Sequence, residues 1–452
     1  MHHSYLKSMT YYLIFLLVAS ISFIVWATAY MKLNAFFALA LAALLVGVLS
    51  GLPLPSIVST LKVGFGHTME KIGLLIILGT TLGLILEKTG ATTSMANAIL
   101  KLVNENNAPA AIALTGFVIG FPIFCDSGFI ILSGLNHSLV KKTKHTMPVM
   151  AAALATSLYA VHCLVPPHPG ITAAVGTVGG DLGMVMLWGI ILAAPVALIG
   201  YFWSVWQGKG ISHAYIEQEE VQIAVDTLPS AVLSFLPVFL PIALIAFKSI
   251  VFLFVSKALA EQSFSLQFIA FIGEPVMALA IGIVFSLLLI QKKYRKDLSH
   301  WLTDGVEKAG MILAIIAAGG MFGEMLQATG IGKNLGELLS GYALGIFFPF
   351  VITAILKTAQ GSSTVAIITA SSLITPMLVN LGLTTPMDIT LTILSMGAGS
   401  MMISHANDAY FWVISRFSNL ETSATLKVYS TATLAMAFTA QIIIWLFFNY
   451  LH

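Results

Sequence analysis

Apolar runs of about 20 residues recur along this 452-residue chain, and they restrict its fold more than any other feature. Tyr11–Tyr30, Leu33–Gly51 and Met184–Trp206 are three of them. As a helix, a run of this length spans the hydrocarbon core of a bilayer. Only 9% of the residues are charged, against about 25% in an ordinary soluble domain. The sequence therefore predicts an all-α, multi-pass membrane protein with the lipid bilayer as its main partner.

Charge and cysteine content exclude several other classes of protein. The formal net charge of +2 gives no sign of a nucleic-acid partner. Cys125 and Cys163 both lie in apolar segments, so the sequence shows neither a disulfide framework nor a zinc motif. We predict no metal site and no cofactor. Tyr11–Tyr30 lacks the small-residue cleavage pattern of a signal peptide, and we expect it to be a retained span.

A polar break interrupts the apolar stretch Gly120–Ser133, which reads GFPIFCDSGFIILS. A carboxylate at membrane depth is costly, so Asp126 needs a partner, a water-filled cavity or a function. Pro122 and Gly128 disturb the helix on either side, and non-helical backbone inside a bilayer is tolerated only where it lines protein or water. These features predict a binding site. The alternative is a kinked helix whose aspartate caps a broken end.

The two apolar arms that flank Asp126 are short. Ala108–Phe121 and Gly128–Val140 would each form about 20 Å of helix, too little to cross a core of about 30 Å. We therefore predict a re-entrant hairpin over residues 108–140. A single broken helix through the same residues is the alternative.

The second half of the chain resembles the first. Glu70–Gly73 (EKIG) recurs as Glu307–Gly310 (EKAG), and Gly83–Gly90 (GLILEKTG) recurs as Gly323–Gly330 (GEMLQATG). If both hairpins are re-entrant, five crossings separate the equivalent spans Ile72–Lys88 and Ala309–Ala328, and an odd number makes the repeats inverted. Counting the first hairpin as a span would make them parallel instead.

Three further polar breaks accompany this repeat. Gln360–Thr364 (QGSST) lies between short apolar arms and predicts a second re-entrant hairpin over residues 342–381. Val165–Gly170 (VPPHPG) contains three prolines, so the span over residues 147–175 cannot remain helical there. Ser404–Asp408 (SHAND) predicts a second broken helix over residues 387–412. Inverted repeats with broken helices are typical of secondary transporters, which hold their substrate near the membrane midplane.

The predicted organisation has five parts, taken in order: N-terminal spans 1–62, a first inverted repeat 63–206, a linker 207–228, middle spans 229–300 and a second inverted repeat 301–452. Basic clusters at 141–144 and 292–296 are expected on the cytoplasmic side. An even number of predicted crossings separates them, so both clusters fall on the same side. The linker is then cytoplasmic.

The four breaks supply the candidate substrate-binding residues. Helix N-termini favour anions, and glycine with a run of hydroxyls offers hydrogen-bond donors, which suits a carboxylate or polyhydroxy substrate. In the alternative interpretation the hydroxyls only cap their own helices. The candidates are Asp126, Ser127, His168, Gln360, Gly361, Ser362, Ser363, Thr364, His405 and Asn407.

Proton coupling is predicted at Asp126, His168, His405 and Asp408. Histidine titrates near neutral pH, and a carboxyl group in apolar surroundings favours its neutral form, so either type can carry a proton. His168 and His405 occupy matching places in the two repeats, whereas His162 has no counterpart. A hydrogen-bonded structural role is the alternative for each histidine.

Four stretches resemble signature stretches of the gluconate permease family, in the same order: GFPIFCDSGFIIL, LVPPHPGITAA, KTAQGSSTVAIITA and SHANDAYFW. The similarity runs from about Val63 to the C-terminus. It implies a bacterial inner-membrane importer of gluconate or a related small hydroxy or amino acid, generally a proton symporter. It also implies a homodimer with an elevator-type mechanism, in which a transport domain moves against a scaffold. The scaffold would contain residues 1–62 and 229–300.

Two of these stretches depart from the family pattern. The family often has FFDAG where this chain has Phe124–Gly128 (FCDSG), and SHVNDAGFW where this chain has Ala406 and Tyr410. These positions bear on which substrate hydroxyls are recognised. We therefore expect a proton-coupled importer of gluconate or a related hydroxycarboxylate, with D-serine, glycerate or a hexuronate as alternative substrates. The sequence leaves sodium coupling open.

A membrane-embedded enzyme that uses histidine and aspartate is a second class of function. No serine or cysteine nucleophile has a histidine base nearby in the sequence, which disfavours it. A channel is a third class, disfavoured because two closed hairpin tips suit alternating access better.

Overall fold

The computed structural model describes residues 2–102, 107–211, 227–255, 263–330, 345–405 and 407–451. Within these ranges the regular elements are helices, as the composition predicts. The first half contains α1 (His2–Val25), α2 (Ala35–Leu49), α3 (Leu54–Lys88), α4 (Ala91–Leu102), α5 (Ala108–Ile119), α6 (Cys125–Lys142), α7 (Met147–Leu164), α8 (Pro169–Val178) and α9 (Leu182–Gly208). The second half contains α10 (Ala231–Phe254), α12 (Phe264–Ile272), α13 (Pro275–Ser286), α14 (Leu298–Ala328), α16 (Phe347–Gln360), α17 (Ser363–Ile374), α18 (Pro386–Ser400), α19 (Ala409–Phe417), α20 (Thr422–Thr425) and α21 (Thr431–Leu451).

Six of the described helical segments are long and apolar enough to cross a membrane, and the pair α12 and α13 adds a seventh if it forms one span. That pair bends by 67°, because Pro275 begins α13 and cannot continue the hydrogen-bond ladder of α12. Three arms of the predicted hairpins are shorter: α5, α16 and α17 have 12, 14 and 12 residues. The fourth arm is longer than predicted, because α6 has 18 residues, or about 27 Å of helix.

The two longest helices, α3 and α14, begin earlier than the sequence suggests. The repeat indicated spans near residues 72–88 and 309–328, but α3 begins at Leu54 and α14 at Leu298. The missed part of α3 carries polar residues such as Lys62 and Glu70, which interrupt an apolar pattern without breaking a helix. The predicted division after residue 62 therefore lies inside α3.

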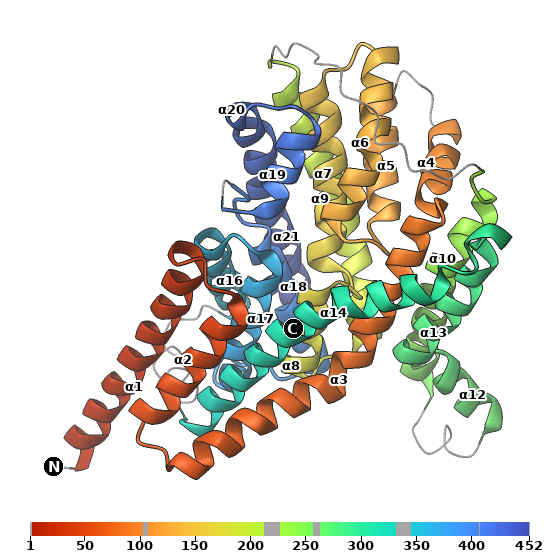
Figure 1. The fold of residues 1–452 in the computed structure, drawn as a ribbon. Coiled ribbons are helices and arrows are strands. Elements are labelled where there is room, and N and C mark those ends of the chain that lie inside the picture. Colours follow the sequence, from red (N-terminus) through yellow and green to blue (C-terminus); the bar gives the residue numbers. More distant parts are fainter. Residues whose placement is uncertain are drawn as a thin grey trace.

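These two helices lie side by side along the front of the molecule in Figure 1. A Cβ atom on Gly64 of α3 would lie only 2.5 Å from the carbonyl oxygen of Gly320 in α14, and one on Gly305 would lie 2.6 Å from Thr81. Rising residue numbers in α3 thus face falling numbers in α14, so the helices run antiparallel. Glycine at the crossing lets the two backbones touch.

The centre of the molecule holds the first broken span. The chain leaves the helix at Val165–His168, between α7 and α8, where the prolines predict a break. In the most apolar part of this span, 94% of the residues are buried inside the protein, whereas the share is 22% for α10. A second non-helical segment, Met401–Asp408, separates α18 from α19, also at a predicted break; its Ala406 lies outside the described residues. Most of the predicted linker 207–228, and residues 342–344 of the predicted second hairpin, also lie outside the described residues.

Candidate functional site

The first polar tip joins α5 to α6. The chain is non-helical from Phe121 to Phe124, and Asp126 lies in the first turn of α6. Its Oδ1 atom is buried and has no hydrogen-bond partner. Asp126 therefore does not cap the broken helix end, as it would in the alternative interpretation of a kinked helix. A buried carboxylate oxygen without a partner is expensive, which suits an atom that meets a ligand or a proton.

The second polar tip joins α16 to α17. Gly361 has a φ of +84°, a left-handed conformation that glycine adopts without steric cost. Ser362 caps α17 by accepting a hydrogen bond from the Val365 backbone nitrogen at 3.3 Å. One hydroxyl of the QGSST run thus caps its own helix, as the structural alternative expected. Neither amide atom of Gln360 has a hydrogen-bond partner.

Each broken span holds the backbone of one tip through a histidine. His168 Nε2 lies 2.7 Å from the carbonyl oxygen of Gly120 in the first tip. His405 Nε2 lies 3.1 Å from the carbonyl oxygen of Thr358, at the end of α16. Asn407 donates to the same carbonyl oxygen at 2.8 Å. These bonds satisfy carbonyl groups that a helix end leaves without intrahelical partners.

The two tips and the two breaks enclose one cavity of about 350 Å³. This volume lies at the lower end of the range of about 300–1,000 Å³ for small-molecule sites. Four helices begin at its wall, because the first residues of α6, α8, α17 and α19 line it. Ile312 and Ile315 of α14 add an apolar patch. The backbone N–H groups at these four helix starts favour a bound anion.

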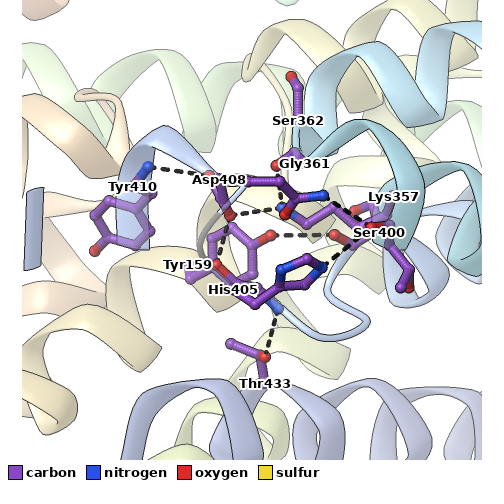
Figure 2. A network of polar contacts seen from close by, with 12 residues as sticks. Tyr159, Lys357, Gly361, Ser362, Ser400, His405, Asp408, Tyr410 and Thr433 are labelled. Atoms are coloured by element: carbon purple, nitrogen blue, oxygen red, sulfur yellow. Dashed lines mark hydrogen bonds and ion pairs between the residues drawn. The ribbon is translucent and has the colours of Figure 1, made fainter. Parts of the chain in front are cut away.

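A buried ion pair joins Asp408, in this wall, to Lys357 behind it (Figure 2). Lys357 Nζ is 2.5 Å from Asp408 Oδ2 and also donates to the carbonyl oxygen of Gly361. Asp408 further accepts a hydrogen bond from Ser404 Oγ at 2.5 Å and one from the Tyr410 backbone nitrogen at 3.0 Å. The sequence interpretation missed Lys357, although the residue opens the quoted stretch KTAQGSST. The signal was an ammonium group inside an apolar arm at membrane depth.

The structure brings most of the predicted site residues into the cavity wall, but not all of them. Those that line it are Asp126, Gln360, Gly361, Ser362, Ser363, Thr364, Asn407 and Asp408. Ser127, His168 and His405 do not line it. His162, which has no counterpart in the repeat, does line it, and its Nδ1 atom has no partner. Repeat symmetry thus indicated the two histidines that hold the tips, and it missed the one that faces the cavity.

No group of three or more histidine, cysteine, aspartate or glutamate side chains in the described ranges is arranged to hold a metal ion. Apolar spans surround a cavity with polar groups in its wall, and broken helices meet there. This arrangement defines a multi-pass membrane protein of the permease class, which carries small molecules across the bilayer.

The chain belongs to the GntP permease family, whose sequence profile matches residues 11–450. It is 30% identical to a gluconate permease of Pseudomonas aeruginosa, an alignment that covers 93% of this chain and 94% of the relative. It is also 30% identical to the inner membrane permease YgbN of Escherichia coli, with 92% and 93% covered. The family places the chain in the bacterial inner membrane and makes it a permease rather than an enzyme.

A solved structure shares the fold. The YdaH transporter of Alcanivorax borkumensis superposes with a TM-score of 0.62 at 12% identity, and the alignment covers 88% of this chain and 89% of that one. At this identity the likeness concerns the fold alone.

Proposed function

We propose that this permease imports gluconate, or a related small hydroxycarboxylate, together with a proton. Its relatives include a gluconate permease, as noted above. The observation that carries the proposal is the cavity itself, where four helix starts, several hydroxyls and two carboxylates meet. One of these carboxylates, Asp126, has an Oδ1 atom without a hydrogen-bond partner. The helix starts suit the carboxylate of the substrate, and the hydroxyl and amide groups suit its own hydroxyls.

The charge in and behind the cavity wall supports proton coupling. Asp126 and Asp408 contribute two negative charges when ionised, and Lys357 contributes one positive charge. An anionic substrate would then enter a site with an excess negative charge in surroundings of low dielectric constant, which is unfavourable. A proton on Asp126 removes that excess. Substrate and proton would therefore bind together, which is the requirement for symport.

The proposed mechanism is of the elevator type. The inverted repeats are residues 63–206 and 301–452, each extended to the start of its first helix, α3 or α14. The antiparallel course of α3 and α14 supports inversion, because these helices carry the recurring EKIG and EKAG stretches. The parallel roles of His168 and His405, each on the backbone of one tip, support it further. The short arms α16 and α17 support a re-entrant second hairpin, and α5 supports the first, whose other arm, α6, has 18 residues. We include a homodimer, in which the helices outside these repeats, α1, α2, α10, α12 and α13, form the scaffold. Cross-linking in native membranes would test the dimer.

Asp126→Asn tests the function directly. Proteoliposomes with an inward proton gradient should accumulate labelled gluconate, and the variant should lose this accumulation. The variant should still exchange labelled for unlabelled substrate at equal pH on both sides, because binding remains. Asp181→Asn is the matched control: Asp181 is exposed and caps α9 through a 2.7 Å bond from Met184, which asparagine can replace. Full accumulation by Asp126→Asn would remove this residue from proton coupling.

Competition identifies the substrate within the class. An excess of unlabelled gluconate should suppress uptake more strongly than D-serine, glycerate or fructuronate does. If one of these competitors accumulates and gluconate does not, the permease function stands and the substrate is that competitor.

A further inference from the structure

Lys357 lies in the last turn of α16, and its side chain is fully buried. An ammonium group removed from water is tolerated only when it is paired and hydrogen-bonded. Its contacts are Asp408 Oδ2, the carbonyl oxygen of Gly361 and the ring of Tyr159, whose centroid lies 5.8 Å away. Each of these three residues lines the cavity, whereas Lys357 does not. It therefore supports the site from behind.

The two carboxylates of the cavity differ in their surroundings. Both oxygens of Asp408 accept hydrogen bonds, from Lys357 and Ser404 at Oδ2 and from the Tyr410 backbone at Oδ1. Oδ1 of Asp126 has no partner. A proton on Asp408 would leave the Lys357 ammonium buried without its counter-ion. A proton on Asp126 would remove a buried charge that has no counter-ion of its own. The same proton is therefore accepted more favourably at Asp126.

Other titratable side chains surround these two carboxylates, on α6, α7, α19 and the short π-helix Leu426–Ser430. They are Cys125, Tyr159, His162, Cys163, Tyr410 and Tyr429. Thiols and phenols are ordinarily neutral at physiological pH, whereas histidine titrates near it. His162 is thus the group whose contribution to a pH profile must be separated from that of Asp126.

Lys357 also connects two segments that are distant in the sequence. It joins the end of α16 to Gly361 in the second tip and to Asp408 at the start of α19. His405 and Asn407 bind the Thr358 carbonyl oxygen of the same helix end. The second tip and the second break are therefore held as one unit. A positive charge already bridges a carbonyl oxygen and a carboxylate there, the kind of oxygen pair that a sodium ion would otherwise join.

We infer that Lys357 is a positioning residue that keeps Asp408 ionised and fixes the second tip, so that Asp126 carries the coupled proton and transport needs no sodium. This inference rests on the proposed function and assigns different roles to the two carboxylates. The sequence predicted proton coupling at both of them.

Five variants test the inference in proteoliposomes at matched protein amounts: three of the ion pair, one control and His162→Gln. Asp408→Asn leaves an unpaired buried ammonium, and Lys357→Met leaves an unpaired buried carboxylate; each should lower kcat/KM by about a hundredfold. The double variant Lys357→Met/Asp408→Asn removes both charges, so it should recover expression and keep the wild-type pH profile. Its KM should rise about tenfold because the bond to the Gly361 carbonyl is lost. Lys308→Met, a half-exposed lysine 3.9 Å from Glu87, is the control.

The outcomes separate this inference from the proposed function. Failure of the wild type to accumulate substrate under a proton gradient refutes the proposed function, and with it the coupled proton on Asp126. A different combination of results overturns the inference and leaves the proposed function standing. In it the wild type accumulates substrate, the double variant has a changed pH profile of uptake, and His162→Gln has the wild-type profile. Replacement of sodium by choline should leave wild-type uptake unchanged, and a requirement for sodium also overturns it. If the single variants do not fold, the double variant and the choline substitution still decide.

Discussion

Replacing Gly361 with alanine would test whether transport depends on the close contact between the second tip and the second break. Gly361 has a φ of +84°, and a Cβ atom there would lie 2.1 Å from the carbonyl oxygen of Asn407 and 2.6 Å from its carbonyl carbon. Both of these are backbone atoms, so no side-chain rotation relieves the clash. One of the two segments must move.

These distances set the size of the expected losses of stability and of uptake. Ordinary van der Waals contact begins at 3.4 Å, so the segments must separate by about 1.3 Å (3.4 − 2.1). Left-handed backbone costs alanine about 1–2 kcal/mol. The shift also strains the Asn407 bonds to Thr358 and Ala359, at 2.8 and 3.3 Å, each worth about 0.5–1.5 kcal/mol. A misplacement of about 1 Å in a site costs about a hundredfold in rate. We therefore expect a stability loss of a few kcal/mol and a loss of uptake of about a hundredfold.

The assay compares initial uptake rates in proteoliposomes with thermal unfolding in detergent. Gly382→Ala is the matched control, because Gly382 has a φ of +70° and nothing lies within 4 Å of a Cβ atom built there. It carries similar backbone strain without a clash. If Gly361→Ala transports as fast as Gly382→Ala, the contact between tip and break is not needed, and the reasoning is refuted.

Three further predictions concern the tips and the core. His168→Leu removes the 2.7 Å bond to the Gly120 carbonyl. The protein should still fold, and uptake measured over a range of substrate concentrations should show a raised KM. An unchanged KM would contradict this role. Thr385→Ala breaks the capping box of α18 and should lower thermal stability by about 1 kcal/mol without changing uptake at a temperature where it stays folded. Gly397→Ala would place Cβ 2.5 Å from the Cys163 carbonyl oxygen and should reduce the yield of folded protein on size exclusion, whereas Gly134→Ala, in open space, should not.

Local signals in the sequence were enough to locate the breaks. The prolines of VPPHPG remove backbone donors wherever they occur, and the chain is non-helical from Val165 to His168. Gly361 and Asp126 stand out in apolar runs in the same way, and both line the cavity. Each of these predictions depends on a few neighbouring residues, so no tertiary information was needed.

Features that depend on distant contacts could not be predicted. Lys357 pairs with Asp408, 51 residues further along the chain. The sequence shows an ammonium group in an apolar arm, but it does not show which carboxylate pairs with it. The ring of His168 binds a carbonyl of the first tip, 48 residues earlier in the chain, and His162 faces the cavity instead. The polar start of α3 becomes helical because it packs along α14, and an apolar-run criterion cannot register that.

The burial of α7 and α8 means that different helices of one chain have different surroundings: protein around α7 and α8, and lipid around the peripheral helices. In the most apolar part of the broken span 94% of the residues are buried inside the protein, whereas in that of α10 the share is 22%. Replacement of lipid by detergent changes the surroundings of α10 and leaves those of α7 and α8 almost unaltered. The tips and breaks around the cavity should then keep their geometry, and their capacity to bind a ligand, during solubilisation. Bilayer thickness and lipid composition should act on the peripheral helices first, and so on the speed of transport rather than on what is recognised.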